Sequence, residues 1–419
     1  MKTRALILAL ALAGLCISVH VSTGADAPAA GVPDTARVTP SQPKPVATQP
    51  VDLAICLDTS GSMSGLIDSA KQKLWAVVNE LASATPAPDL RVGLIQYGND
   101  GLDPTTGWVE RKLGLTSDLD EVYNQLFALT TNGGQEYVAR AITLARESME
   151  WSADPRALKI VFVCGNEPAT QDPEITVSQA CEAAIAHDII VNSIYCGPPQ
   201  SDEALGWQEV AKLADGEYGA IDQDSGTVVI ATPFDAEITE LGARLNTTYV
   251  PRAGAEGEKG VANQTRQDAN AAGLGGGVAA DRAMAKAGAM YRNAAWDLVD
   301  ASQEEGFDLA SVPEDELPEN MRPMSLEERK TYLASQLATR QQIQRQVVEL
   351  GRKRMEFIHA ELEKQNLDDS KALDFAIRQA VRRQAESKGF TFTEPTRPPE
   401  PAAVAPPAPE TSPPAAPAK

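Results

Sequence analysis

Basic side chains are a minority in this sequence, and histidine and aromatic residues are rare. The chain of 419 residues has 37 Lys and Arg against 58 Asp and Glu, a formal net charge of -21. Nucleic-acid binding needs clustered Lys and Arg facing phosphates, so this balance argues against that class of function. It suits a soluble protein that holds cations. Aromatic residues make up only 5%, so we expect one well-packed core together with segments that bury little.

Recognisable catalytic arrangements are also missing. Of the three histidines, His187 and His359 follow the N-terminal segment and are too isolated to form a zinc pair. The sequence has no Ser-His-Asp arrangement, no phosphate-binding G-x-x-x-x-G-K-[ST] loop and no H-E-x-x-H motif. Acid-base chemistry would fall to carboxylates, and no pairing pattern indicates it. We therefore predict that the protein is not an enzyme.

The first 27 residues have the pattern of a secretory signal peptide. Lys2 and Arg4 precede an apolar stretch, Ala5 to Val19, that is short for a membrane span, and Ala25-Asp26-Ala27 fits an A-x-A cleavage site. We expect cleavage near Ala27 and a periplasmic or secreted protein; the alternative is an uncleaved anchor. No later segment is long and apolar enough to span a bilayer.

Cysteines are few and their spacing resembles no metal-binding motif. Those that follow the predicted signal peptide are Cys56, Cys164, Cys181 and Cys196. An exported protein can form disulfides. Two interpretations stay open, buried free thiols or one disulfide among the last three.

Composition divides the rest of the chain into five parts. A Pro-rich linker is expected over residues 28–49, an α/β domain over 50–252, a Gly/Ala-rich linker over 253–280, a helical region over 281–390 and a disordered Pro/Ala-rich tail over 391–419.

Strands and amphipathic helices alternate in the α/β domain. The segments 51–56, 157–165 and 189–197 are almost wholly apolar, whereas 106–115 alternates in the manner of an edge strand. Continuous apolar strands separated by helices predict a Rossmann-like, mainly parallel sheet with helices on both faces.

A long helical pattern dominates the C-terminal region. Ser325 and Glu328 form a capping box that places a helix start there. The apolar spacing that follows is interrupted by Arg340, Gln344 and Gly351. We therefore expect a helical hairpin rather than a long regular coiled coil.

Three oxygen-bearing side chains follow the first apolar strand, in the stretch "LDTSGSM" (57–63). Asp58 supplies a charge, and Gly61 allows a sharp turn that brings the hydroxyls of Ser60 and Ser62 to the same point. Oxygen ligands of this kind suit Mg²⁺ or a similar divalent cation. Two neutral ligands leave such a cation able to accept a carboxylate from a partner. The alternative is a helix N-cap turn that satisfies backbone donors.

These residues match the D-x-S-x-S motif of von Willebrand factor type A (vWA) domains, and the strand-helix order over 51–250 is similar to that fold. In the family this motif is the first loop of the metal-ion-dependent adhesion site (MIDAS). The second loop usually carries a Thr, where this chain has Gln135 followed by Glu136. The resemblance implies a cation site in which Glu136 replaces that ligand; the alternative is a first-turn acid of a helix.

The third loop of the family usually ends its strand with Thr-Asp-Gly. This chain has Cys164, Gly165 and Asn166 at those places, followed by Glu167, so the Asp is missing. Glu167 is a further acid at this loop or a solvated side chain. The segments "GNEP" and "CGPPQSDEALGW" also resemble a group of exported bacterial vWA proteins of uncertain function.

Two functions compete at this stage. The first is an extracytoplasmic protein-binding module with a MIDAS-like site made by Asp58, Ser60, Ser62 and Glu136. The second is a structural or assembly scaffold with a degenerate metal site, whose C-terminal helices make the contacts. Neither the protein partner nor the oligomeric state can be read from the sequence.

Overall fold

The computed structural model describes residues 48–221, 230–365 and 373–392. The predicted signal peptide (1–27), nearly all of the predicted linker (28–49) and most of the predicted tail (391–419) lie outside the described residues. Among the helices described, none combines the length and apolar character needed to cross a bilayer.

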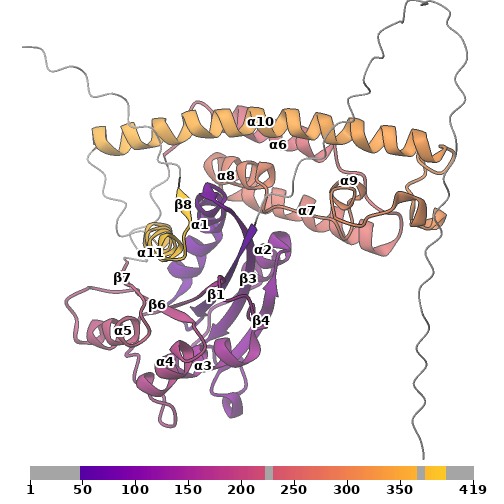
Figure 1. The fold of residues 1–419 in the computed structure, drawn as a ribbon. Coiled ribbons are helices and arrows are strands. Elements are labelled where there is room, and N and C mark those ends of the chain that lie inside the picture. Colours follow the sequence, from indigo (N-terminus) through magenta and orange to yellow (C-terminus); the bar gives the residue numbers. More distant parts are fainter. Residues whose placement is uncertain (1–47, 222–229, 366–372, 393–419) are drawn as a thin grey trace, which may run out of the picture. The chain divides into compact units, whose positions relative to one another are not determined.

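A six-stranded sheet in the order β4-β3-β1-β5-β6-β7 forms the centre of the α/β domain (Figure 1). Its strands are β1 (Thr48–Asp58), β3 (Ala87–Tyr97), β4 (Val109–Thr116), β5 (Leu158–Gly165), β6 (Ile190–Tyr195) and β7 (Tyr218–Ala220). Every neighbouring pair is parallel except β3 and the edge strand β4. The predicted, mainly parallel sheet is therefore confirmed.

Helices cover both faces of this sheet, as predicted. One face carries α1 (Ser64–Ala82), α2 (Leu119–Phe127) and α11 (Leu373–Ser387), and the other carries α3 (Val138–Ser148), α4 (Val177–Ile185) and α5 (Asp202–Leu213). Successive β1 residues point to opposite faces. Leu53, Ile55 and Leu57 belong to the first core, while Ala54 and Cys56 belong to the second.

The four cysteines of the described residues are buried free thiols. The free-thiol interpretation of Cys56, Cys164, Cys181 and Cys196 is thus confirmed, and these side chains act as small apolar groups in the two cores.

The expected linker over 253–280 is wrong, because this segment is helical. It forms α7 (Ala255–Leu274) and most of α8 (Gly276–Ala287). Its glycines permit close packing: a Cβ at Gly257 would lie 1.8 Å from the Arg252 carbonyl oxygen, and one at Gly260 2.3 Å from the Trp296 ring. The buried face of α7 also uses polar groups such as Gln267. Apolar periodicity therefore gave no sign of this helix.

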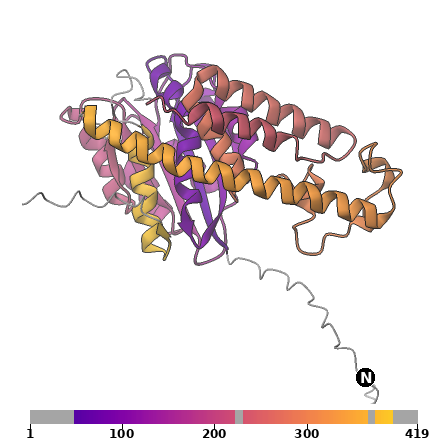
Figure 2. The ribbon, with the colours of Figure 1, turned by 90° about the horizontal axis from the view of Figure 1, so that it is seen from above.

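The expected hairpin is also wrong. Residues Leu326–Gln365 form one continuous helix, α10 (Figure 2). The capping box does start it, since the Ser325 amide donates to the Glu328 carboxylate at 2.7 Å. The residues that interrupt the apolar spacing of this helix make tertiary contacts rather than turns. Arg340 is buried and pairs with Asp297, and a Cβ at Gly351 would lie 2.9 Å from the Met284 methyl carbon.

Further short elements connect these parts. They are β2 (Ala84–Thr85), β8 (Thr391–Phe392), α6 (Asp235–Asn246), α9 (Leu298–Ala301) and the 3-10 turns η1 (Pro104–Thr106), η2 (Leu309–Ser311) and η3 (Glu314–Glu316). Helix α6 packs against α8 and α10 in a core of its own, although the sequence pattern grouped it with the α/β domain.

The C-terminal helix α11 belongs to the α/β core rather than to a separate helical region. Its residues Ile377 and Val381 are buried in the same cluster as β1 and α1. The side-chain amides of Gln384 on α11 and Asn192 on β6 exchange two hydrogen bonds of 2.6 and 3.0 Å. The chain thus returns after α10 to complete one face of the sheet.

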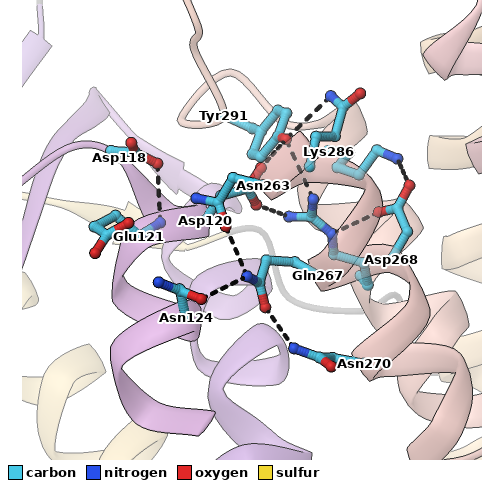
Figure 3. Close-up of polar contacts among 12 residues, drawn as sticks. Asp118, Asp120, Glu121, Asn124, Asn263, Gln267, Asp268, Asn270, Lys286 and Tyr291 are labelled. Carbon is cyan, nitrogen blue, oxygen red and sulfur yellow. Dashed lines mark hydrogen bonds and ion pairs between the residues drawn. The ribbon is translucent and has the colours of Figure 1, made fainter. Parts of the chain in front are cut away.

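A buried ionic network joins helices α7 and α8 to α2 (Figure 3). Arg282 is 2% exposed and pairs with Asp120 of α2 at 2.5 Å and with Asp268 of α7 at 2.9 Å. The Tyr291 hydroxyl donates to Asp120 at 2.6 Å, and Lys286 donates to Asp268 at 2.7 Å. Each buried charge has an opposite charge beside it, which offsets its loss of hydration.

The packing of α11 predicts different effects for one substitution at two sites. Val381→Ala should lower the free energy of unfolding by about 2 kcal/mol, because Val381 is 1% exposed and the change removes buried methyl groups. Val348→Ala is the matched control, since Val348 on α10 is 64% exposed. Urea unfolding of both variants checks this, and equal midpoints would contradict the placement of α11.

The ionic network predicts a larger loss. Arg282→Met keeps an unbranched apolar stem but leaves Asp120 and Asp268 without the guanidinium, so we expect a loss of about 3–5 kcal/mol in unfolding free energy. Arg345→Met on the exposed side of α10 should stay within about 0.5 kcal/mol of the wild type. The same urea measurement decides it; a small effect at position 282 would show that the network contributes little.

Candidate metal centre

The carboxyl end of β1 carries the first set of predicted ligands, and the structure brings them together. Asp58 is fully buried, Ser60 is nearly so, and Ser62 is exposed. The Ser60 amide donates to Asp58 Oδ1 at 2.7 Å, and the Ser60 and Ser62 hydroxyl oxygens lie 3.3 Å apart. One tight turn therefore presents a carboxylate and two hydroxyls at the sheet edge.

The loop before α3 brings Glu136 to the same place. Gln135 is exposed, whereas Glu136 is only 7% exposed. Gly98, at a positive φ of 76°, lies between the two acids: a Cβ there would be 2.6 Å from Asp58 Oδ1 and 2.9 Å from Glu136 Cγ. Gly134 packs as tightly as Gly98, since a Cβ added at Gly134 would lie 2.3 Å from the Gly98 carbonyl oxygen. Of the two candidates in this loop, Glu136 is the one that adjoins Asp58.

The end of β5 has no room for the carboxylate that vWA domains usually have at this place. A Cβ at Gly165 would lie 2.5 Å from the Tyr97 hydroxyl, 3.0 Å from the Trp207 ring and 3.2 Å from Asp58 Oδ2. The next residue, Asn166, instead exchanges hydrogen bonds of 3.1 and 3.3 Å with the Ser62 hydroxyl. The third loop therefore supports the first loop through an amide.

Two buried carboxylate oxygens at this centre have no hydrogen-bond partner, Asp58 Oδ2 and Glu136 Oε2. Burial raises the pKa of the Asp58 carboxyl above its ordinary range, against the Ser60 amide, which lowers it. Burial also raises the pKa of Glu136, and the negative charge of Asp58 raises it further. Both carboxylates therefore lack the counter-charge that their ionised forms require.

Glu167 adds to this imbalance from the rim. Its side chain is exposed, and its charge raises the pKa of both Asp58 and Glu136. Its backbone carbonyl accepts a 2.8 Å hydrogen bond from the Trp207 indole. No ion pair reaches Asp58 or Glu136 from a Lys or Arg among the described residues.

The donor set is one of carboxylates and hydroxyls, which are ligands for a hard divalent cation. Within the described part of the chain, no group of three or more His, Cys, Asp and Glu side chains is arranged to hold a metal ion. Ser60 and Ser62 would therefore have to supplement Asp58 and Glu136. The two unpartnered carboxylate oxygens fit that role.

Sequence reasoning missed the residues that shape this centre. Tyr97 ends β3 and Gly98 follows it, and the Tyr97 hydroxyl donates to the Cys164 carbonyl at 2.8 Å. The Gln171 side chain accepts from the Glu136 amide at 3.4 Å. A signal existed for the first two, because the carboxyl end of β3 lies at the same sheet edge as that of β1. No pattern indicated Gln171.

Residues 53–167 match the family model of the von Willebrand factor type A domain. The chain contains a vWA domain. The matched segment includes all four predicted ligands as well as Gly165. No curated protein sequence matches the chain.

The solved structures that are similar to this chain are distant from it in sequence. The SpRpn10 VWA domain is 13% identical, with 44% of this chain and 99% of that chain covered and a TM-score of 0.32. Proximal thread matrix protein 1 from the mussel byssus is 12% identical, with 42% of each chain covered and a TM-score of 0.31. Its form with a zinc-occupied MIDAS motif is 12% identical, with 41% of each chain covered and the same TM-score of 0.31. The chain thus spans less than half the length of the mussel protein.

The raised carboxyl pKa values predict a pH effect in the metal-free vWA protein. Between pH 5 and 8 the folded state holds protons that the unfolded state releases near its ordinary carboxyl pKa of about 4, so the free energy of unfolding falls as pH rises. Glu136→Gln removes one of these groups and should reduce the fall. Urea unfolding of the chelator-treated protein at about pH 5 and about pH 8 measures this fall in the free energy of unfolding.

A matched control separates this effect from the other carboxyl groups. Glu304→Gln changes an exposed acid elsewhere in the chain and should keep the wild-type pH dependence. If Glu136→Gln and Glu304→Gln behave alike, Glu136 titrates as an ordinary surface carboxyl and the unpartnered buried site is refuted.

Proposed function

We propose that the vWA domain is a binding module that holds Mg²⁺ or a similar divalent cation with Asp58, Ser60, Ser62 and Glu136. The cation would give a protein partner a point of attachment. The observation that carries this proposal is the pair of buried, unpartnered oxygens, Asp58 Oδ2 and Glu136 Oε2. A buried carboxylate without compensation costs several kcal/mol, and a bound cation would remove that cost.

The position of the centre supports a binding role. It lies at the carboxyl ends of parallel strands, where ligand sites form in α/β sheets. The surrounding loops are open: Ser62, Asn132, Gly133 and Glu167 are exposed. A partner can therefore approach the site without rearrangement of the core.

We propose a binding module rather than an enzyme, and we place it outside the cytoplasm. The first part rests on the absence from the sequence of the nucleophile and base motifs considered above. The second rests on the signal-peptide pattern of residues 1–27, which lie outside the described residues. The competing scaffold function requires a site that binds no metal, so cation binding discriminates between the two.

Asp58→Asn provides the main test, because the amide keeps an acceptor for the Ser60 amide but removes the charge. In wild-type protein, Mg²⁺ or Mn²⁺ at about 100 times its dissociation constant should raise the free energy of unfolding by about 2.7 kcal/mol relative to chelator. Asp58→Asn should lose most of this gain. Thermal or urea unfolding under the three conditions measures it.

Asp89→Asn is the control, since Asp89 is an exposed residue near the opposite, N-terminal end of β3. It should keep the full stabilisation by cation. Coincident curves with Mg²⁺, Mn²⁺ and chelator in the wild type would refute the metal site and leave the scaffold function.

A further inference from the structure

The second acid of the candidate metal centre lies on the second loop rather than on the third. Asp58 and Glu136 both lie against Gly98, so the protein itself supplies two carboxylates to the centre. Two such groups neutralise the formal charge of a divalent cation. The packing of Tyr97 and Trp207 against Gly165 keeps the third loop from adding another ligand of this kind.

The rim of the centre is acidic as well. Glu167 is exposed and directly follows Asn166, whose side-chain amide donates to the Ser62 hydroxyl at 3.1 Å. Asp100 is exposed on the neighbouring loop, where its carboxylate oxygen lies 3.1 Å from the position of a Cβ at Gly133. With a divalent cation bound, the centre and its rim would carry a net negative charge.

Arg140, the first basic residue of α3, does not offset the negative charge of the centre and its rim. Arg140 of α3 makes two hydrogen bonds of 2.9 Å to Asp172 and a third of 2.9 Å to Glu174. Its guanidinium is therefore committed to a pair of acids of its own. A further carboxylate at the cation would meet several like charges, and Arg140 is not free to offset them.

We propose that this site selects a partner segment that offers the cation a neutral oxygen, from a main-chain carbonyl, an amide or a hydroxyl, beside Lys or Arg side chains, and that Glu136 and Glu167 exclude a carboxylate. The inference rests on the cation binding proposed above and specifies the partner's chemistry. Basic groups of the partner would lie against Glu167 and Asp100. Charge complementarity of this type acts chiefly on selectivity and association rate.

Acetate is the probe for carboxylate access, with Mn²⁺ as the reporter ion in the full chain. Electron paramagnetic resonance gives the occupancy of Mn²⁺, and water-proton relaxation reports displacement of its water by acetate. In the wild type, acetate should displace little water. In Glu136→Gln, the apparent affinity for acetate should rise about tenfold, since a like charge at the ion is lost.

Glu167→Gln is a second variant that keeps every proposed ligand. It should raise the apparent affinity for acetate by about threefold, because the charge it removes is solvent-exposed and screened. If Glu136→Gln no longer holds Mn²⁺, the acetate affinity of Glu167→Gln decides whether the acidic side chains exclude a carboxylate. Glu304→Gln, remote in sequence and exposed, should leave the affinity unchanged.

The test for a basic partner compares two capped peptides of six residues. In the Lys-Ser peptide Lys and Ser alternate, and in the Glu-Ser peptide Glu and Ser alternate. The Lys-Ser peptide should bind the Mn²⁺-loaded chain at least tenfold more tightly than the Glu-Ser peptide, and this difference should shrink in Glu167→Gln. Binding of the Lys-Ser peptide should also weaken when chelator removes Mn²⁺.

The outcomes separate this inference from the proposed function. Absence of bound Mn²⁺ in the wild type overturns both. Bound Mn²⁺ that acetate reaches equally in the wild type, Glu136→Gln and Glu167→Gln leaves the metal site standing and overturns the exclusion of carboxylates. A Lys-Ser peptide that binds equally with and without Mn²⁺ overturns the neutral-oxygen contact to the ion.

Discussion

Asp58 and Glu136 meet at the carboxyl edge of the sheet, and each keeps a buried oxygen without a hydrogen bond. This arrangement opposes stability, since burial favours the neutral form of each acid. The backbone around them nevertheless fits it closely. Gly98 has a positive φ, and side chains there or at Gly134 would collide with the acids or the neighbouring strand end. The loops are thus shaped around a pair of acids whose ionised forms have no counter-charge among the described residues.

Helices from later in the sequence pack against the domain that carries this edge. Helix α11 closes one face of the sheet from the far end of the sequence, and the Arg282 network ties α7 and α8 to α2. Helices α7, α8 and α11 therefore pack against the vWA domain, while α6, α8 and α10 also share a separate core. At the carboxyl edge of the sheet, Ser62, Asn132, Gly133 and Glu167 are exposed.

The sequence predicted those features that depend on apolar periodicity or on a short motif. The strand-helix alternation, the edge strand and the turn from Asp58 to Ser62 are of this kind. The linker and the hairpin were wrong because glycine and charged residues were taken as breaks. Gly260 instead leaves room for the Trp296 ring, and Arg340 on α10 pairs with the buried Asp297 and the half-buried Asp300. Such residues are interpretable only when their distant partners are known.

The candidate site shows the same division between local pattern and distant packing. The glycine at position 165 could be read from the sequence as a missing carboxylate, but the reason lies in Tyr97 and Trp207, which occupy the space beside it. Glu136 is close in sequence to an exposed glutamine and yet turns inward to Asp58. The centre therefore keeps a second acid on a different loop, where the side chain is buried and its charge adjoins that of Asp58. Under the cation binding proposed above, the ion would meet both of these charges within the protein, and the acidic rim would then favour a neutral oxygen from the partner.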